Sequence, residues 1–283
     1  MKYKLVVVTV TYNPIIAELH AFVNSFMKYN DLGEYAKLVV IDNSPESSWD
    51  IKLFKKQYPM IAFIENPQNP GFGAANNIGF ELFESDYVLF MNNDTEFIQP
   101  VFRSLIKICE SNNRIGCIGI HQLGGAPSFF PKMTAPKNID NNHFDDSYHF
   151  ISGAFMFFRS SAFKECGMFD SNLFLYFEEF DISIRLRKKG FCTKYVSKLS
   201  FWHKVGNRRC INEKTWKSAV PSFCYICKKY NLDPQYYSKG IMRRLKILLL
   251  YHCFLFHIKE AKKIWNVYKF RKEVIYKEFG VKI

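Results

Sequence analysis

Three apolar stretches in the first hundred residues end abruptly in polar side chains that could bind a ligand. The stretches are 4–10, 37–41 and 87–91, and the polar residues after them are Tyr12, Asn13, Asp42, Asn43, Asn92, Asn93 and Asp94. Short apolar runs bounded by turn-forming residues predict buried strands, and ligands of open α/β sheets lie outside the carboxyl ends of such strands. Carboxylate and amide oxygens suit a divalent cation and sugar hydroxyls. An ordinary Asn/Asp turn explains any one of these ends, but their repetition is harder to attribute to turns.

A second group of reactive side chains is the carboxylate cluster Glu178, Glu179 and Asp181, which begins a predicted helix. Like charges so close together raise the pKa of at least one member, which suits a general base working near neutral pH. Acidic residues in a first turn also complement the helix dipole, so capping is the alternative, although three carboxylates exceed what capping needs. His203 follows two short predicted strands, 194–196 and 199–201; a lone histidine is more often structural than a ligand.

The elements that position these residues alternate between strand and helix with short connections. This order predicts an α/β fold whose central sheet is mainly parallel, with helices on both faces. The strands are expected at 4–10, 37–41, 61–65, 87–91, 115–121 and 152–158, and the helices at 15–29, 47–57, 74–83, 99–111 and 160–166. Residues 122–148 are polar and are expected to form a long, mobile loop that closes over a ligand.

Composition and motifs exclude several other classes of protein. The chain has 283 residues, 48% of them hydrophobic, which is enough for one large domain or for a domain with an appendage. Gly71-Phe-Gly73 does not continue into a dinucleotide fingerprint, and no P-loop sequence occurs. We expect neither a signal peptide nor a transmembrane helix. The eight cysteines are scattered, which favours buried free thiols in a reducing cytoplasm.

The net charge of +13 is unevenly distributed along the chain. Residues 1–184 hold 14 Lys and Arg against 21 Asp and Glu, whereas residues 185–283 hold 25 against 5, a balance of +20. This asymmetry predicts an anionic partner for the C-terminal part, with a solvated basic face as the alternative. Predicted helices at 216–231 and 239–279 are basic and amphipathic, which is typical of segments on an anionic membrane and also of ordinary packing. We therefore expect a domain at 1–215 and a helical extension at 216–283.

Seven motifs occur in an order that resembles the family-2 inverting glycosyltransferases, particularly the bacterial rhamnosyltransferase-like branch that builds O-antigen and capsule chains. They are VVVTVTYNP (6–14), VVIDNS (39–44), NPGFGAANNIGF (69–80), YVLFMNNDTEF (87–97), SGAFMFFRSSAFKECGMFD (152–170), LYFEEFDISIRLRKKGF (175–191) and FWHKVGNR (201–208). The resemblance covers residues 4–210 and implies the Rossmann-like fold called GT-A, which binds nucleotide-diphosphate sugars.

The same resemblance implies a donor site at the strand ends. Thr11, Tyr12 and Asp42 would hold the nucleoside, and Asn76 and Asn77 would lie near it. The neighbouring positions that we include in this site are Asn13, Asn43, Gly73, Asn92 and Asn93.

The metal and the general base are also implied by the resemblance. Asn92-Asn93-Asp94 occupies the position of the metal-binding "DxD" motif, Glu179 that of the base, and His203 that of a histidine closing the metal and diphosphate site. Two residues depart from the family pattern. Asn92 replaces the first acidic residue of DxD, which leaves Asp94 as its sole carboxylate, and Glu179 stands where Asp is usual. The base among Glu178, Glu179 and Asp181 therefore stays open.

The implied activity is transfer of one hexosyl or deoxyhexosyl unit, with inversion, from a UDP- or dTDP-sugar to a hydroxyl of a lipid-linked or growing surface glycan. Mg²⁺ or Mn²⁺ is the expected cofactor. A polyprenyl-diphosphate-linked acceptor and an anionic membrane surface are the expected partners, and the expected location is the inner face of a bacterial cell membrane. A sugar nucleotidyltransferase would need a glycine-rich phosphate loop that TVTYNP lacks. A nucleic-acid-binding protein is disfavoured by the carboxylate cluster and by the lack of a matching motif, so no nucleic acid is expected.

Overall fold

The computed structural model describes residues 2–46, 48–204 and 211–283, and the chain folds into two compact units. The first unit comprises Met1–Ser171 and Glu178–Val205, and the second Asn172–Phe177 and Gly206–Ile283. Sequence analysis did not predict that the short segment Asn172–Phe177 belongs with the C-terminal helices. The division into 1–215 and 216–283 stays a prediction.

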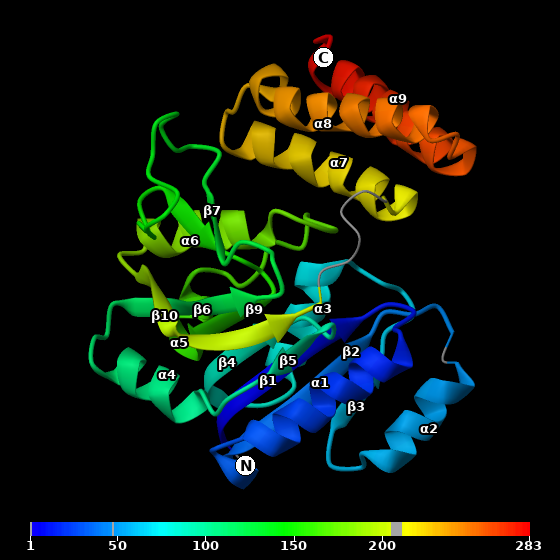
Figure 1. The fold of residues 1–283 in the computed structure, drawn as a ribbon. Helices are drawn as coiled ribbons and strands as arrows, with labels where there is room; N and C mark the ends of the chain where they lie inside the picture. The colour runs from blue at the N-terminus through cyan, green and yellow to red at the C-terminus, as the bar shows by residue number, and fades with distance from the viewer. Residues whose placement is uncertain (1, 47, 205–210) are drawn as a thin grey trace. The chain divides into compact units, whose positions relative to one another are not determined.

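The first unit is built on a sheet of eight strands in the order β3-β2-β1-β4-β9-β6-β10-β5 (Figure 1). Its strands are β1 (Tyr3–Thr11), β2 (Ala36–Asp42), β3 (Ala62–Glu65), β4 (Ser85–Met91), β5 (Thr95–Phe97), β6 (Ile115–Leu123), β9 (Phe155–Arg159) and β10 (Cys192–His203). The pairs β1–β2, β1–β4, β2–β3 and β6–β10 are parallel, whereas β9 is antiparallel to β4 and β6, and β5 to β10. The predicted α/β class and mainly parallel sheet are confirmed. The two short strands predicted at 194–196 and 199–201 are one strand, β10, with an irregularity between Val196 and Ser200.

Helices cover both faces of this sheet, because alternate residues of each central strand are apolar on both sides. Leu5 and Val7 of β1 pack with α1 (Ile16–Tyr29), α2 (Trp49–Gln57) and α4 (Phe102–Glu110). Val6 and Val8 point the other way and join the cluster of α3 (Phe72–Glu81), α5 (Ser160–Glu165) and α6 (Glu178–Lys188). A 3₁₀ turn, Gly33–Tyr35, precedes β2. The fold thus has helix, sheet and helix layers, with the strand ends left to form a site.

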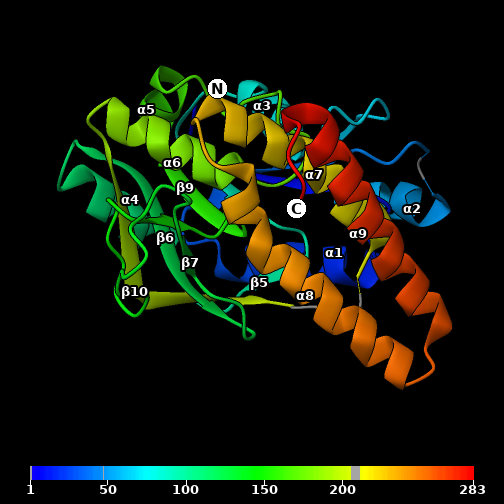
Figure 2. The same cartoon turned by 90° about the horizontal axis from the view of Figure 1, so that it is seen from above.

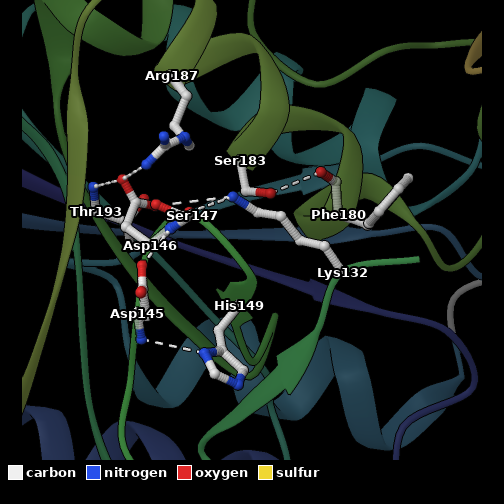
Figure 3. A network of polar contacts seen from close by, with 9 residues as sticks. All are labelled: Lys132, Asp145, Asp146, Ser147, His149, Phe180, Ser183, Arg187 and Thr193. Atoms are coloured by element: carbon white, nitrogen blue, oxygen red, sulfur yellow. Dashed lines mark hydrogen bonds and ion pairs between the residues drawn. The ribbon is translucent and has the colours of Figure 1, made fainter. Parts of the chain in front are cut away.

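The segment predicted as a long loop, 122–148, contains a short strand and makes several contacts with the rest of the first unit. Its strand β7 (Phe129–Pro131) pairs antiparallel with β8 (His149–Ile151). Next to β7, the buried Lys132 donates a hydrogen bond of 2.5 Å from Nζ to the Asp146 carbonyl oxygen. The Asp146 carboxylate accepts from the Thr193 backbone N–H at 3.1 Å and lies 3.5 Å from Arg187 Nη1 (Figure 3). These contacts join the segment to β10 and α6, while its mobility stays a prediction.

The buried Lys132 gives the unfolding free energy a pH dependence that can be measured. Burial lowers the pKa of Lys132 from 10.5 to about 8. Between these pH values the unfolded chain holds a proton that the folded chain has lost, so stability from this group rises with pH. Relative to Lys132→Met, the wild type should gain about 2 kcal/mol between about pH 7 and about pH 9.5. Urea unfolding of both proteins at the two pH values checks this, and a constant difference would contradict it.

The second unit contains three long helices, α7 (Glu213–Lys229), α8 (Pro234–Phe254) and α9 (Ile258–Phe279). The single helix predicted over 239–279 is wrong: α8 and α9 are separate, and Phe256 between them has a left-handed φ of 54°. No Gly or Pro occurs at this break, so the apolar periodicity of the sequence predicted one uninterrupted helix.

The helices α8 and α9 pack on each other through apolar side chains: Leu245 and Leu248 of α8 contact Ile264 and Val267 of α9. Within the three described ranges, no helix has the length and apolarity to cross a membrane.

Candidate functional site

The carboxyl ends of β1 and β2 form the first part of the site, where β1 lies between β2 and β4 and the strand order reverses. The buried Asp42 accepts three hydrogen bonds at Oδ1: from Thr11 Oγ1 at 2.9 Å, from the Ser44 N–H at 3.1 Å and from Ser44 Oγ at 2.5 Å. The Asn13 N–H in turn donates to Ser44 Oγ at 2.7 Å. These bonds fix the Asp42 carboxylate at the strand end, beside the exposed ring of Tyr12. Ser44 lies in the VVIDNS motif but was not predicted as a site residue.

A chain of amides extends this edge toward α3. Asn66 Nδ2 donates to Asn43 Oδ1 at 2.7 Å, and Asn43 Nδ2 donates to Asn69 Oδ1 at 3.1 Å. Asn66 and Asn69 were not predicted as site residues; their place in a Pro/Gly-rich loop after β3 was the available signal. These two hydrogen bonds attach the loop that leads into α3 to Asn43 at the end of β2.

The α3 residues predicted near the nucleoside make contacts within the protein. Asn76 Nδ2 donates to the Phe72 carbonyl at 3.0 Å. Asn77 bonds twice to the Phe169 backbone: its Nδ2 donates to the carbonyl at 2.8 Å, and its Oδ1 accepts from the N–H at 3.1 Å. Gly73 lies against Glu178, since a β-carbon at this glycine would stand 3.1 Å from Glu178 Cγ. These residues position the segment before α6 and its carboxylates.

The three predicted carboxylates occupy different environments. Glu178 is buried, with 3% of its surface exposed, and its Oε1 has no hydrogen-bond partner among the described residues. Burial and, second, the neighbouring Glu179 raise the pKa of Glu178 well above its ordinary value. Burial also raises the pKa of Glu179, which is half-buried. Asp181 is fully buried and paired with Arg185, at 2.6 Å between Oδ2 and Nη2. The geometry therefore favours Glu179 as the carboxylate that an incoming hydroxyl can reach.

A short backbone segment, Gly153-Ala154, connects this carboxylate with the end of β4. The Ala154 carbonyl accepts from the Asn92 N–H at 3.2 Å. A β-carbon at Gly153 would stand 3.5 Å from Glu179 Cδ, so the Glu179 carboxylate lies against the residue that precedes Ala154. Asn93 lies in the turn between β4 and β5. The structure thus brings the predicted base next to the predicted metal motif.

Asp94 and His203 lie close together at the end of the β5–β10 pair. Asp94 Oδ1 lies 3.4 Å from His203 Nε2, and the Lys204 N–H donates to the Asp94 carbonyl at 3.0 Å. Asp94 Oδ1 is buried without a hydrogen-bond partner among the described residues, as is His203 Nδ1. An unpartnered carboxylate oxygen beside an imidazole nitrogen fits a divalent cation such as Mn²⁺. Within the described ranges, no group of three or more His, Cys, Asp or Glu residues surrounds this pair. Residues 205–208 of the FWHKVGNR motif lie outside the described residues.

Comparison with known proteins agrees with this arrangement. The family described as Glycosyl transferase family 2 matches residues 6–167. A curated Bacillus spizizenii protein, poly(ribitol-phosphate) beta-glucosyltransferase, is 31% identical over 173 residues, which are 58% of this chain and 26% of that protein. The chain thus spans about a quarter of the length of this relative.

Solved structures share the fold at lower sequence identity. The mannosyltransferase PcManGT from Pyrobaculum calidifontis, in complex with GDP-Man and Mn²⁺, has a TM-score of 0.58 at 13% identity, covering 94% of this chain and 74% of that one. S. aureus TarS 1-349 has a TM-score of 0.56 at 14% identity, covering 97% and 91%. The sheet topology and these solved neighbours together show that the first unit has the GT-A fold. The chain belongs to glycosyltransferase family 2.

Proposed function

We propose that this protein is an inverting transferase that moves one sugar from a UDP- or dTDP-sugar to a glycan hydroxyl. The observation that carries the proposal is the Gly153-Ala154 segment, which contacts Glu179 on one side and Asn92 of the DxD-like motif on the other. A base and a diphosphate site joined in this way suit direct displacement, because the hydroxyl that the base deprotonates attacks the same anomeric carbon from which the diphosphate departs.

The donor nucleoside binds at the ends of β1 and β2 in this proposal. The fixed Asp42 carboxylate accepts hydrogen bonds from the nucleoside, and the exposed Tyr12 ring stacks on it. The amides of Asn43 and Asn69 border the same edge. The donor sugar then extends past Asn92 toward Glu179.

In the transfer step, Glu179 takes the proton from the acceptor hydroxyl as the hydroxyl oxygen attacks the anomeric carbon. The bond from that carbon to the diphosphate breaks on the opposite face, which inverts the configuration. Asp94 and His203 would hold Mg²⁺ or Mn²⁺, which when bound neutralises charge on the departing diphosphate. Glu178 packs against Gly73, and Asp181 pairs with Arg185 within α6.

The acceptor in this proposal is a lipid-linked or surface glycan in O-antigen, capsule or related polymer biosynthesis, and the protein acts at the inner face of a bacterial membrane. Two observations support this class: the +20 balance of residues 185–283, and the relative whose name specifies a poly(ribitol-phosphate) acceptor. Both favour an anionic environment for the acceptor.

A thermal-shift series with UDP-, dTDP- and GDP-sugars, each with and without Mn²⁺, tests the proposed function. A bound donor raises the melting temperature by mass action, and Mn²⁺ should enlarge the shift for the true donor. UDP- or dTDP-sugars should give the largest shift. A shift with none of these donors would contradict the proposal, and a shift confined to GDP-sugars would overturn its choice of nucleotide.

A further inference from the structure

The turn that joins α8 to α9 exposes a cluster of large apolar side chains. We call residues 250–259 the hairpin tip; α8 and α9 lie side by side and meet there (Figure 2). Phe254 is 81% exposed, Phe256 86%, Ile258 76% and Leu250 70%. Monomeric soluble proteins rarely expose so many large apolar residues together, and such clusters mark protein or membrane contacts.

Packing within the helix pair does not require these side chains. The buried contacts between α8 and α9 include Leu245 and Leu248 with Ile264 and Val267, which lie two to eight residues outside the tip. The exposed side chains of Leu250, Phe254, Phe256 and Ile258 do not belong to this cluster, so we expect the cluster to survive their replacement. The packing of α8 on α9 therefore does not explain why the exposed side chains of the hairpin tip are apolar.

The backbone at the tip strengthens this argument. Phe256 has a φ of 54°, a conformation that favours Gly or Asn, and the Ile258 N–H donates to its carbonyl at 2.9 Å. A turn of this kind is normally filled by a small or polar residue. Here the chain carries a phenylalanine that is both conformationally disfavoured and exposed to water.

The charges around the tip indicate the chemistry of its partner. From Pro234 to Lys259 the chain has five Lys and Arg and no Asp or Glu. Lys246, Lys259 and Lys262 are exposed near the tip, whereas Glu260 is paired with Lys263 at 2.6 Å. An apolar tip with a cationic border complements an anionic lipid surface, whose headgroups meet the lysines while the apolar side chains enter the acyl boundary. Two copies joined tip to tip would bring these cationic borders together.

We propose that the hairpin tip inserts into the interface of an anionic phospholipid bilayer. This inference deepens the membrane location given under the proposed function, and it names the segment that makes the contact. It assigns the binding to a few side chains at one turn, and not to the amphipathic faces of α8 and α9, which pack on each other.

Vesicle co-sedimentation tests the proposal with the full chain. The wild type should bind vesicles of equal parts phosphatidylglycerol and phosphatidylcholine, and bind pure phosphatidylcholine far less. Phe254→Ser/Phe256→Ser should lower the partition by at least about tenfold, and replacing Lys246, Lys259 and Lys262 with Gln should lower it about fivefold per charge. Tyr276→Ser is the matched control, since Tyr276 is 56% exposed on α9 but about 27 Å along the helix from Ile258. It should bind like the wild type.

Three results would overturn the proposal: no binding by the wild type, equal binding by the Phe254→Ser/Phe256→Ser variant, or lipid-free dimers that this variant abolishes. The last would make the tip an interface between copies, and sedimentation velocity detects it. Circular dichroism melting confirms that each variant is folded. Donor-induced thermal shifts should be the same for wild type and tip variant, so failure of lipid binding and failure of the proposed transferase function are distinguishable.

Discussion

Replacing Glu179 with Gln is expected to lower kcat by about 10²- to 10⁴-fold while leaving donor binding unchanged. The amide keeps the size of the side chain next to Gly153 but cannot accept the acceptor proton. In the wild type, kcat/KM should fall as the pH drops through the apparent pKa of the Glu178–Glu179 pair. Burial raises the pKa of Glu179, so this acidic limb should lie above the ordinary glutamate value of 4.5. Initial rates across pH and donor thermal shifts measure both effects.

Two further variants make this test specific. Glu165→Gln removes an exposed carboxylate from α5 of the same unit and should not change the rate. Glu178→Gln removes a buried acid whose pKa is raised in the folded state, so the wild type should lose stability relative to the variant as the pH rises from the ordinary glutamate value of 4.5 toward that raised pKa. A larger loss of kcat in Glu178→Gln than in Glu179→Gln would exchange the two roles.

The second large effect is expected for Asp94→Ala. Asp94 Oδ1 and His203 Nε2, 3.4 Å apart, are the ligands that we assign to the cation. Loss of the sole carboxylate should remove cation-dependent stabilisation of the diphosphate worth several kcal/mol, which corresponds to about a 10³-fold loss in rate. The Mn²⁺-dependent part of the donor thermal shift should disappear with it.

The neighbouring Glu96 provides the control for this variant. It lies on β5 two residues after Asp94 and pairs with Trp202 in the strand register. Glu96→Gln removes one negative charge two residues away on β5, so it reports any effect of charge alone. Equal loss of the Mn²⁺-dependent shift in both variants would remove Asp94 from the metal assignment.

Much of the first unit could be predicted because its strands are short and apolar and end in turn-forming residues. The runs predicted at 4–10, 37–41 and 87–91 are β1, β2 and β4, with boundaries within two residues. Parallel strands buried on both faces leave a strong local pattern, and their carboxyl ends must meet at one edge. The approach of Asp42 to Thr11 follows from that register.

The remaining features depend on contacts between distant segments. The bonds of Asn77 to Phe169 join residues 92 positions apart, and no local pattern distinguishes this amide from one that binds a ligand. The sequence shows Asp181 and Arg185 at the i, i+4 spacing of a helical ion pair. It does not show that Asp181 is fully buried whereas Glu179 is only half-buried. The break at Phe256 was missed because neither Gly nor Pro marks it.

The backbone bond from Asn92 to Ala154 also has a consequence for how the two substrates communicate. Because β9 runs antiparallel beside β4, we expect any shift of the β4 end to move Gly153 as well, and with it the surroundings of Glu179. Donor and acceptor then each alter the other's affinity by the same factor, as thermodynamic reciprocity requires. The expected behaviour is cooperative binding of the two substrates, transmitted through one peptide group.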